Sequence, residues 1–551
     1  MSKKKNVAIG NEAIYDARTL GSGKMLVLGI QHMFAMFGAT VLVPMLTGLD
    51  ISTTLLFAGL GTLLFHCITG FKVPAFLGSS FVFINGYAAV KGMSAMYGMT
   101  EKEILPYACF GVACAGLVYL VLALFFRIIG IDKVMKFFPP VVTGPIIIAI
   151  GLGLAGSAVA NCSTNWVIAL IALAVVIIFN IWGKGMAKII PIILGVVIAY
   201  AVGAGLDIAA ALVPGLSEKV PFLFSGNNID FTPITSIVKS IGEVNIFGDA
   251  DIVGLPVHKE STIFAIDWRN TSLLISSIVA IVPLSLATMM EHIGDISAIS
   301  STTGNNFIKE PGVHRTLIGD GLATSLASVF GAPANTTYGE NTGVLALTKV
   351  YDPRVIRIAA FFATGISFFP IVAGVIETIP TAIVGGISFI LYGMISAVGV
   401  RNVVESKVDF SKSRNLIIAA VILVTALGVP NGLAFDAGTV HITLTNVALA
   451  SLLGILLNAI LPGKDYLVAT EEPTSTGVDF ALGENSERLE KEEAAEEAAE
   501  AVEEKAEEAV EAVEETAEEA ADEAVETVEE KAEEVAEEAA EAVEEAAEKA
   551  E

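Results

Sequence analysis

The sequence predicts an all-α membrane protein in which fourteen transmembrane segments form a seven-plus-seven inverted repeat. Hydrophobic residues make up 54% of the chain and the mean hydropathy is +0.70, far above the values of soluble domains. Twelve apolar runs approach the ~20 residues that a helix needs to cross a bilayer, and two shorter segments are interrupted by Gly, Ser, Asn and Pro. Lys and Arg gather in alternate short loops, as this number of crossings requires.

The predicted segments fill a transmembrane domain at residues 25–465, after an N-terminal segment at 1–24. The apolar runs are residues 25–46, 51–70, 104–126, 139–160, 165–182, 189–213, 271–293, 316–330, 354–376, 380–400, 414–429 and 438–461, and the interrupted segments are 74–90 and 333–348. The basic residues of the N-terminal segment place both termini in the cytoplasm and the long polar loop at about 214–270 outside. The first run follows Lys24 and is long enough to span, so no cleavable signal is expected and the protein is assigned to the cell membrane.

The formal charge of −27 belongs almost entirely to the C-terminal end of the chain. Residues 484–551 hold 31 of the 59 acidic and 5 of the 32 basic residues, so the chain before them is nearly neutral. Apolar residues recur there at alternating spacings of three and four, which predicts an acidic helical tail behind a linker at 466–483. A solvated tail without chemistry of its own, a self-associating coil and a docking tail for a basic partner all fit this pattern.

The two interrupted segments occupy equivalent places if the crossings divide into two halves of seven. Val73–Gly86 is the third segment of the first half, and Gly331–Gly343 is the third of the second half. Because seven is odd, the second half runs through the membrane in the opposite sense, and paired interrupted segments in such repeats indicate a binding site near the midplane. We expect a short extended piece at Ser79–Phe83 to pair with Asn335–Tyr338, each leading into a half-helix.

Ionisable residues accompany this interrupted backbone. Glu291 and Asp295 end the apolar run that begins the second half, and Glu340 lies in the second interrupted segment. Such residues at membrane depth are costly and usually mark an ion or substrate pathway, which indicates a transporter of a small polar substrate. Two carboxylates can accept hydrogen bonds from a substrate's N–H groups, while the amides at half-helix starts donate to its carbonyls. Two buried like charges also favour taking up a proton with the substrate.

The signature Glu340-Asn341-x-Gly343-x-x-x-x-Thr348-Lys349 resembles that of the nucleobase/ascorbate transporters, the second class of nucleobase–cation symporters. Gln31-His32, Gly78–Phe81 and the Glu291-His-Ile-Gly stretch are similar to that family as well. The resemblance covers about residues 20–465. Within the family the chain looks most like the bacterial uracil permeases, because the signature begins with Glu where purine and urate carriers commonly have Gln.

This resemblance implies a fold with a core and a gate, and it implies roles for particular residues. Segments 1–4 and 8–11 form the core that carries substrate, and segments 5–7 and 12–14 form the gate that also makes a homodimer. By position, the residues that match substrate-binding ones are Glu291, Glu340, Phe81, Gly339, Tyr338 and Tyr392. Asp320 matches an acidic residue linked to coupling, and Glu291, Asp295 and Asp320 are the expected proton-coupling residues. Asp295 departs from the family pattern, because many uracil permeases have His at this position.

Each of these polar residues has a structural alternative. Glu291 and Glu340 could pair with neighbouring spans, and Asp295, on the same helix face as Glu291, could be a polar residue at a helix end. His292 points about 100° away from Glu291, so helix packing is the expected role. His32 and His66 are expected to make structural hydrogen bonds.

The function expected is therefore import of uracil by proton symport, with xanthine or another nucleobase as the alternative substrate. An anion carrier of similar architecture would favour cationic or neutral residues where Glu291 and Glu340 stand. An intramembrane enzyme lacks support, because the sequence has no HExxH or GxSxG motif and no metal-ligand cluster. Uracil, protons and membrane lipid are the expected partners, with no cofactor, no metal and no nucleic acid. The four cysteines are expected to be small buried residues.

Overall fold

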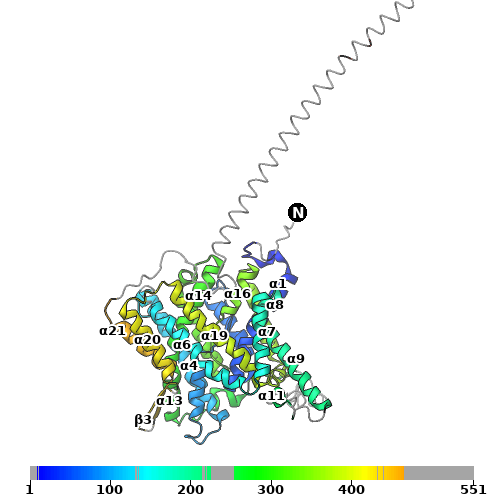
Figure 1. Cartoon of the computed structure of the whole chain (residues 1–551). Helices are drawn as coiled ribbons and strands as arrows, with labels where there is room; N and C mark the ends of the chain where they lie inside the picture. Colours follow the sequence, from blue (N-terminus) through cyan, green and yellow to red (C-terminus); the bar gives the residue numbers. More distant parts are fainter. Residues whose placement is uncertain are drawn as a thin grey trace, which may run out of the picture. The chain divides into compact units, whose positions relative to one another are not determined.

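The computed structural model describes residues 9, 12–130, 133–134, 136–213, 218, 220–224, 253–430, 432–438, 440–463, 531 and 536. Most of the predicted linker and acidic tail, and residues 225–252 of the predicted external loop, lie outside the described residues. The described chain is mostly helical (Figure 1). Its first half holds η1 (Ala17–Leu20), α1 (Ser22–Thr47), α2 (Ile51–Ile68), β1 (Leu77–Ser79), α3 (Ile84–Gly92), α4 (Glu101–Ile129), α6 (Pro140–Cys162), α7 (Trp166–Trp182), α8 (Met186–Ile189), α9 (Pro191–Leu212) and α11 (Pro221–Phe224).

The second half of the described chain repeats the combination of long helices and one interrupted segment. It holds η2 (Lys259–Ser261), η3 (Ile263–Ala265), α13 (Thr271–Ile281), η4 (Val282–Leu284), α14 (Ser285–Thr303), η5 (Ile308–Gly312), α15 (Val313–Val329), β2 (Asn335–Thr337), α16 (Gly339–Thr348), α17 (Pro353–Ser367), α18 (Pro370–Glu377), α19 (Thr381–Glu405), α20 (Ser413–Gly428), β3 (Leu433–Ala437), β4 (Val440–Leu444) and α21 (Asn446–Ile460). Seven described helical stretches are long and apolar enough to cross a membrane, or eight if the bent pair α17–α18 counts as one. The chain is thus a multi-pass membrane protein, and the count of fourteen remains a prediction.

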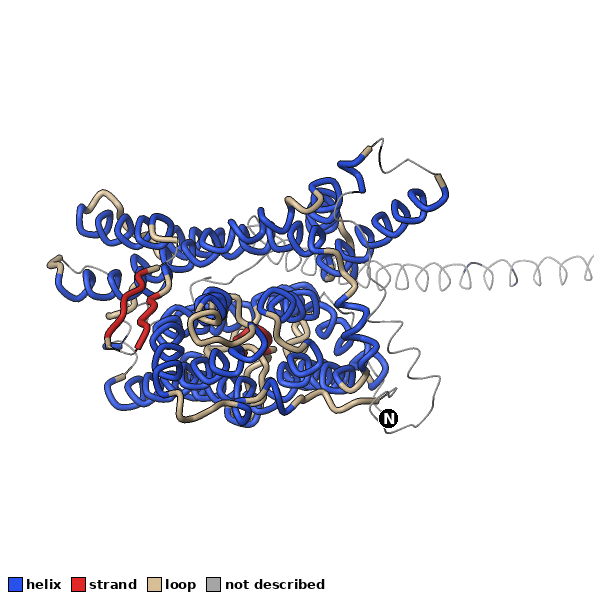
Figure 2. Tube along the Cα trace, turned by 90° about the horizontal axis from the view of Figure 1, so that it is seen from below, coloured by secondary structure: helices blue, strands red, loops and turns tan. Residues whose placement is uncertain are grey.

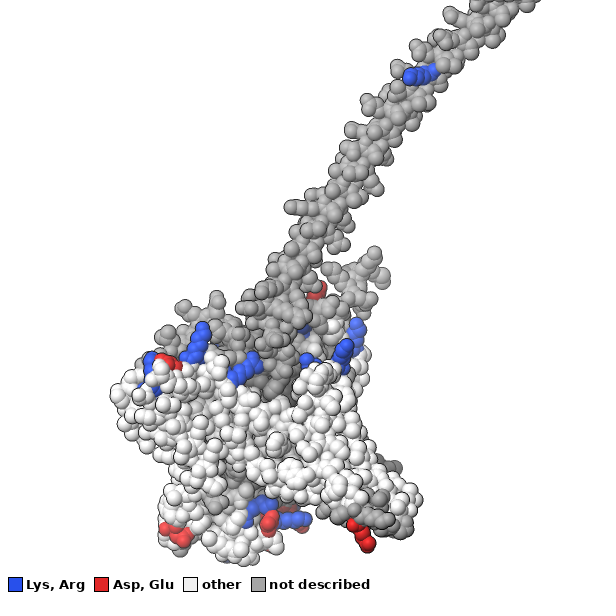
Figure 3. All heavy atoms as spheres, in the orientation of Figure 1, with Lys and Arg blue, Asp and Glu red and all other residues white. Residues whose placement is uncertain are grey.

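The surface of the molecule carries a broad uncharged band. Figure 3 shows Lys, Arg, Asp and Glu side chains toward the two ends of the body, with uncharged side chains between them. On α4, the exposed apolar residues Leu117, Val121, Leu124, Phe125 and Ile128 recur at the spacing of one helix face. An apolar stripe of this size is unfavourable in water and favourable against lipid, so this face of α4 suits a bilayer.

The helices lie in two layers, which appear in Figure 2 as an upper and a lower group of helices. In one layer α1, α2, α14 and α15 contact the short strands β1 and β2, while α17 packs against α2, α4 against α15 and α13 against α4. In the other, α6 packs against α19, α20 and α21, and α19 also contacts α7 and α9. The two layers meet through smaller contacts, including those of α14 with α6 and of α1 with α9.

Small residues let the helices of the first layer approach closely. Where α4 crosses α15, a Cβ added to Gly116 would lie 2.6 Å from the carbonyl oxygen of Gly321, and a Cβ added to Gly321 would lie 2.6 Å from that of Gly116. Both distances are shorter than real side chains tolerate, so only glycine fits this crossing. Close backbone approach at small residues is a main source of helix association in membranes, because lipid provides no hydrophobic drive.

The strands β1 and β2 form an antiparallel pair in the middle of this layer. Leu77 pairs with Thr337, Gly78 with Thr336 and Ser79 with Asn335. The predicted pairing of the two interrupted segments is therefore confirmed, but the first strand lies two residues earlier than the predicted Ser79–Phe83. The ladder ends where Ser80 donates its N–H to the Ala334 carbonyl, and Phe81 then opens a turn by accepting from the Ile84 N–H.

Two predicted spans differ from the structure. The run predicted at 354–376 is broken between α17 and α18, which are bent by 84°. Pro370 has no N–H to continue the helix, and Phe369 before it is extended. The run predicted from 438 begins with a strand, because residues 440–444 pair with β3 and the helix α21 begins only at Asn446, after the cap residue Thr445. Apolar and polar residues alternate from Val440 to Leu444, which is a strand pattern, but the high apolar content of the run favoured a helix.

The N-terminal segment is strapped onto the layer that holds β1 and β2. The N–H of Ile14 donates to the Lys349 carbonyl at 2.8 Å, and its carbonyl accepts from the Tyr351 N–H at 2.9 Å. Tyr15 donates its hydroxyl hydrogen to the Thr303 carbonyl at the end of α14. We call residues 12–20 the N-terminal strap; it joins the ends of α14, α16 and α17.

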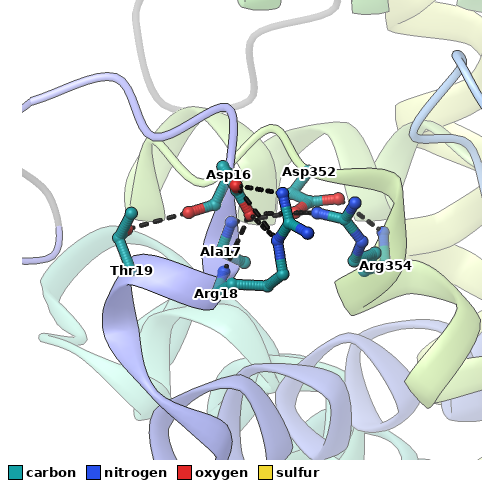
Figure 4. A network of polar contacts seen from close by, with 6 residues as sticks. All are labelled: Asp16, Ala17, Arg18, Thr19, Asp352 and Arg354. Atoms are coloured by element: carbon teal, nitrogen blue, oxygen red, sulfur yellow. Dashed lines mark hydrogen bonds and ion pairs between the residues drawn. The ribbon is translucent and has the colours of Figure 1, made fainter.

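A charged network holds the strap in place (Figure 4). Arg354 Nη1 lies 2.9 Å from Asp16 Oδ1 and 3.0 Å from Asp352 Oδ2, and the Ala17 N–H donates to Asp352 Oδ2 at 2.8 Å. The hydrogen bond and charge of the neighbouring Arg18 guanidinium lower the pKa of Asp16 to about 2 from its usual 3.8. Because this pKa is lowered on folding, the network's stabilising contribution is complete above about pH 4 and is lost as the pH falls toward 2.

A first prediction concerns the glycine crossing. Gly116→Ala should destabilise the protein by about 1–3 kcal/mol, because the new methyl group overpacks the contact with α15. The control is Gly156→Ala in α6, where an added Cβ meets no atom within 4 Å. Thermal unfolding of the purified protein in detergent should show a lower midpoint for the first variant alone. Equal midpoints for the two variants would contradict the proposed close crossing.

A second prediction concerns the strap. Asp16→Asn should speed hydrogen–deuterium exchange of the Ile14 and Ala17 amides at neutral pH, because Arg354 loses one of its two carboxylate partners. In the unaltered protein the same amides should lose protection only as the pH falls from about 4 toward 2. Glu12→Gln, an exposed substitution in the same segment, is the control and should change neither amide. Unchanged exchange in the Asp16 variant would show that the ion pairs do not hold the strap.

Candidate functional site

The predicted site residues come from four places in the fold. Glu291 and Asp295 lie on α14, and Asp320 lies on α15. Tyr338, Gly339 and Glu340 form the junction of β2 and α16, while Phe81 lies between β1 and α3 and Tyr392 on α19. α14 contacts both β2 and α16, so the structure brings the acidic helix beside the interrupted segment.

The acidic residues differ in their surroundings. Glu291 is half-buried, and its Oε2 atom is enclosed by protein. Asp295, one turn later, is buried and accepts a hydrogen bond from Thr337 Oγ1 to its Oδ2 at 2.8 Å. Glu340 lies in the first turn of α16, where the helix N-terminus favours negative charge, and its side chain lies outside what the structure describes.

His292 joins a second acidic residue to this group. Both His292 and Asp320 are fully buried, and His292 Nδ1 lies 3.3 Å from Asp320 Oδ2. This is a close approach of the two groups and not an aligned hydrogen bond, because neither Asp320 oxygen meets hydrogen-bond geometry. The same Nδ1 atom lies 3.4 Å from Thr337 Oγ1. His292, expected as a packing residue, therefore lies between Asp320 and the residue that binds Asp295.

The signature residues anchor α16 at both of its ends. Asn341 donates from Nδ2 to the His32 carbonyl of α1 at 3.2 Å, and the same atom lies 3.3 Å from His32 Nδ1. Thr348 returns its hydroxyl to the Val344 carbonyl, and Lys349 ends the helix in the left-handed conformation with φ of +50°. Gly343 has open space where a Cβ would stand, so local packing does not explain this glycine.

The three aromatic candidates have distinct contacts. Tyr338 donates its hydroxyl hydrogen to the Ser79 carbonyl at 2.9 Å, and its ring lies against Gly78, so it braces the strand pair. Phe81 and Tyr392 meet edge to face with ring centroids 6.1 Å apart. Because Phe81 belongs to the layer around the strands and Tyr392 to the α6–α19 layer, this contact crosses between the layers.

The described residues include no cluster of three or more His, Cys, Asp or Glu side chains that could hold a metal ion. Among the cysteines, Cys109 and Cys162 are buried, Cys114 is partly buried and Cys67 is exposed, so the expectation of burial is wrong for Cys67. The arrangement offers hydrogen-bonding groups, buried acids and aromatic rings around two helix starts. It therefore suits the binding of a small polar molecule.

Sequence reasoning missed Thr337 and the partnership of Asn341 with His32. Thr337 lies between Asp295 and the His292–Asp320 pair. In the sequence it is only one of two adjacent threonines in a polar stretch. His32 and Asn341 are 309 residues apart. Both residues belong to stretches that resemble the family, and this was the one feature of the sequence that could have suggested their contact.

Comparison with known proteins defines the class. Residues 23–435 match the model of a permease family. A uracil permease of Bacillus caldolyticus is 38% identical over 454 residues, which cover 80% of this chain and 93% of that protein. Uracil permeases of Bacillus subtilis and Escherichia coli are 36% and 33% identical, with 80% and 79% of this chain covered and 94% and 90% of theirs.

The fold also has a solved counterpart. The transmembrane domain of the cyanobacterial bicarbonate transporter BicA has a TM-score of 0.53 and 13% identity, covering 81% of this chain and 99% of that one. At that identity the likeness concerns the fold. The chain is thus a membrane permease. It belongs to the nucleobase/ascorbate transporter family, a family of transporters and not of enzymes, and it is similar to the bacterial uracil permeases.

A third prediction concerns the signature asparagine. Asn341→Ala should lower the free energy of unfolding by about 1–3 kcal/mol, because α16 loses its buried hydrogen bond to α1. Thr342→Val is the control: Thr342 is the next residue, is equally buried, and its hydroxyl has no hydrogen-bond partner among the described residues. Thermal unfolding in detergent measures both variants, and a larger loss for the Thr342 variant would contradict the assigned role.

Proposed function

We propose that the protein imports uracil across the cytoplasmic membrane by proton symport. The observation that carries this proposal is the combination of 33–38% identity to uracil permeases over about 80% of the chain with the acidic helix α14 packed against the paired interrupted segments. Uracil alternates two N–H donors with two carbonyl acceptors around a flat ring. The site places acceptors, helix starts and aromatic rings near one another.

In the proposed complex, Glu291 and Glu340 accept hydrogen bonds from the uracil N–H groups. The backbone N–H groups of Phe81 and Gly339 donate to its carbonyls. Gly339 is the first residue of α16, and the first N–H groups of a helix have no partner within it, whereas Phe81 lies in the turn that precedes α3. Tyr338 and Tyr392 pack around the ring together with the Phe81 side chain. Of the signature residues, Asn341, Thr348 and Lys349 hold α16 in place for these contacts, and no contact of Gly343 with the described residues explains its place in the signature.

Protons couple to transport through the acidic residues on α14 and α15. Glu291, Asp295 and Asp320 are the proposed coupling residues, and protons are proposed to drive transport in place of sodium ions. Three acidic groups in a poorly solvated region cannot all remain charged without cost, so a proton taken up with the substrate reduces their repulsion.

We propose that the two layers have different roles in alternating access. The layer around β1 and β2 is the core that carries substrate, and the layer of α6, α7, α9, α19, α20 and α21 is the gate and the homodimer surface. The contact between Phe81 and Tyr392 then breaks and reforms as the core moves. Both termini lie in the cytoplasm in this proposal, and the acidic tail from about Glu484 is dispensable for transport.

A fourth prediction tests this function. Uptake of radiolabelled uracil into proteoliposomes should rise with an inward proton gradient and collapse with a protonophore. Glu291→Gln should reduce uracil binding about tenfold or more, because an amide replaces a charged acceptor in a poorly solvated site. Glu310→Gln, an exposed carboxylate paired with Lys72, is the control and should bind normally.

Competition separates the alternatives. Xanthine should compete poorly with labelled uracil, whereas strong inhibition by xanthine and weak inhibition by unlabelled uracil would assign a purine substrate. Uptake that needs a sodium gradient at fixed pH would contradict proton symport. Inhibition by bicarbonate, without effect of any nucleobase, would assign an anion carrier.

A further inference from the structure

The hydroxyl of Thr337 lies between Asp295 and the His292–Asp320 pair. It donates to Asp295 Oδ2 at 2.8 Å, and it lies 3.4 Å from His292 Nδ1, which is itself 3.3 Å from Asp320 Oδ2. All four residues are at least nine-tenths buried. Thr337 thus stands between one acid on α14 and another on α15.

A threonine hydroxyl has one hydrogen to donate and lone pairs to accept with. The shorter bond to a carboxylate is the stronger one, so the hydrogen points to Asp295 when that group is charged. The oxygen of Thr337 then faces His292 Nδ1 as an acceptor, which requires the His292 hydrogen to be on Nδ1. That N–H also faces Asp320. His292 Nε2 is buried with no hydrogen-bond partner among the described residues, which also favours placing the hydrogen on Nδ1.

Protonation of Asp295 weakens this arrangement. A neutral Asp295 accepts a weaker hydrogen bond from Thr337 than a carboxylate does, so the threonine oxygen becomes a weaker acceptor for the His292 Nδ1–H. That N–H then turns further toward Asp320 Oδ2, which lies 3.3 Å from Nδ1, and its positive end favours the charged form of Asp320. One proton is gained, at Asp295; no other proton changes atom, and His292 stays neutral throughout. Protonation of one acid therefore makes protonation of the other less favourable.

We propose that Thr337 is a positioning residue that couples the protonation of Asp295 to that of the His292–Asp320 pair. This inference rests on the proposed function and specifies how its protons communicate. The two acids then titrate as a coupled pair and not independently.

The position of Thr337 in the chain connects this network to the substrate. Thr337 is the last residue of β2, and α16 begins two residues later at Gly339. Asp295 lies one helical turn after Glu291 on the same face of α14. A shift of the α16 start against α14 when substrate binds therefore changes the Thr337–Asp295 distance, so loading of the site is transmitted to the proton-binding groups.

The other titratable groups near this network can be separated by experiment. Glu291 lies on α14 itself, Tyr119 of α4 lies in electrostatic range of both Glu291 and Asp320, and its hydroxyl donates to Thr288. His66 of α2 is engaged with the Ala75 carbonyl at 2.9 Å. Glu340 lies in the first turn of α16, and its side chain is outside the described part of the chain. None of these groups is altered by substitution at Thr337.

The structure offers a matched control one residue away. Thr336 is in the same strand and equally buried, and its hydroxyl has no hydrogen-bond partner among the described residues. Adjacent strand residues point to opposite faces, so Thr336 faces away from Asp295 and His292. Thr336→Val and Thr337→Val therefore each remove one hydroxyl from the same strand. Only the Thr337 substitution removes the contacts with Asp295 and His292.

The experiment compares three quantities in proteoliposomes: uracil binding, uracil exchange without a proton gradient, and uptake driven by a gradient across a range of external pH. Thr337→Val should retain binding and exchange within about twofold and lose gradient-driven uptake about tenfold, the loss of one hydrogen bond to a charged group. Thr337→Ser, which keeps the hydroxyl, should restore uptake and its pH profile. Thr336→Val should match the unaltered protein.

The outcomes separate the two levels of the proposal. If the unaltered protein neither binds nor exchanges uracil, the proposed function is wrong. If it does both, but Thr337→Val and Thr336→Val have the same pH profile, the coupling role of Thr337 is overturned. Equal loss of binding, exchange and uptake in Thr337→Val, with no rescue by Thr337→Ser, would assign Thr337 a structural role and would also overturn it.

Discussion

The architecture depends on the pairing of two interrupted segments within the membrane domain. Extended backbone there leaves N–H and C=O groups that lipid cannot satisfy, and each unsatisfied group costs several kcal/mol. β1 and β2 satisfy one another, and side chains extend the network: Leu77 donates its N–H to Thr62 Oγ1, and Ser79 donates its hydroxyl to the Thr40 carbonyl. Because the strands come from opposite halves of the chain, this one interaction joins the two halves within the layer.

The crowding around this pair explains why small residues surround it. A Cβ on Gly78 would lie 2.7 Å from Thr40 Oγ1 and 2.5 Å from the nearest atom of the Tyr338 ring. Asn335 reaches from β2 to the Phe57 carbonyl of α2 at 2.8 Å, across a path that Gly61 leaves open. The side chains of Thr62, Ser79 and Asn335 thus hold backbone in place, and the acidic residues of α14 lie beside a braced strand pair.

Much of this arrangement could be predicted from the sequence because it rests on short-range patterns. Apolar runs located the long helices, and Gly, Pro and Asn marked the two interruptions that pair in the structure. The strand boundary was displaced because aromatic and β-branched residues at 81–83 suggested strand, whereas the ladder ends at Ser80. The break before Pro370 was visible as a proline, but its 84° bend depends on packing that no local pattern encodes.

The candidate site was less accessible to sequence reasoning. The acids on α14 and α15 stood out as charges among apolar residues, so their positions needed no structure. Thr337 and Thr336 are indistinguishable in sequence, and their difference arises from which face of a three-residue strand meets α14. His292 was assigned to packing from its angle to Glu291 alone, and its partner Asp320 lies on the next helix of the chain.

The N-terminal strap has a consequence for the order in which the protein is made. Residues 12–20 precede α1 in the chain, but their long-range hydrogen bonds and ion pairs go to residues between Thr303 and Arg354. These bonds cannot form until the second interrupted segment has been synthesised. The strap therefore completes its polar contacts only after α14, α16 and the start of α17 have come together, later than the helix that follows it in the chain.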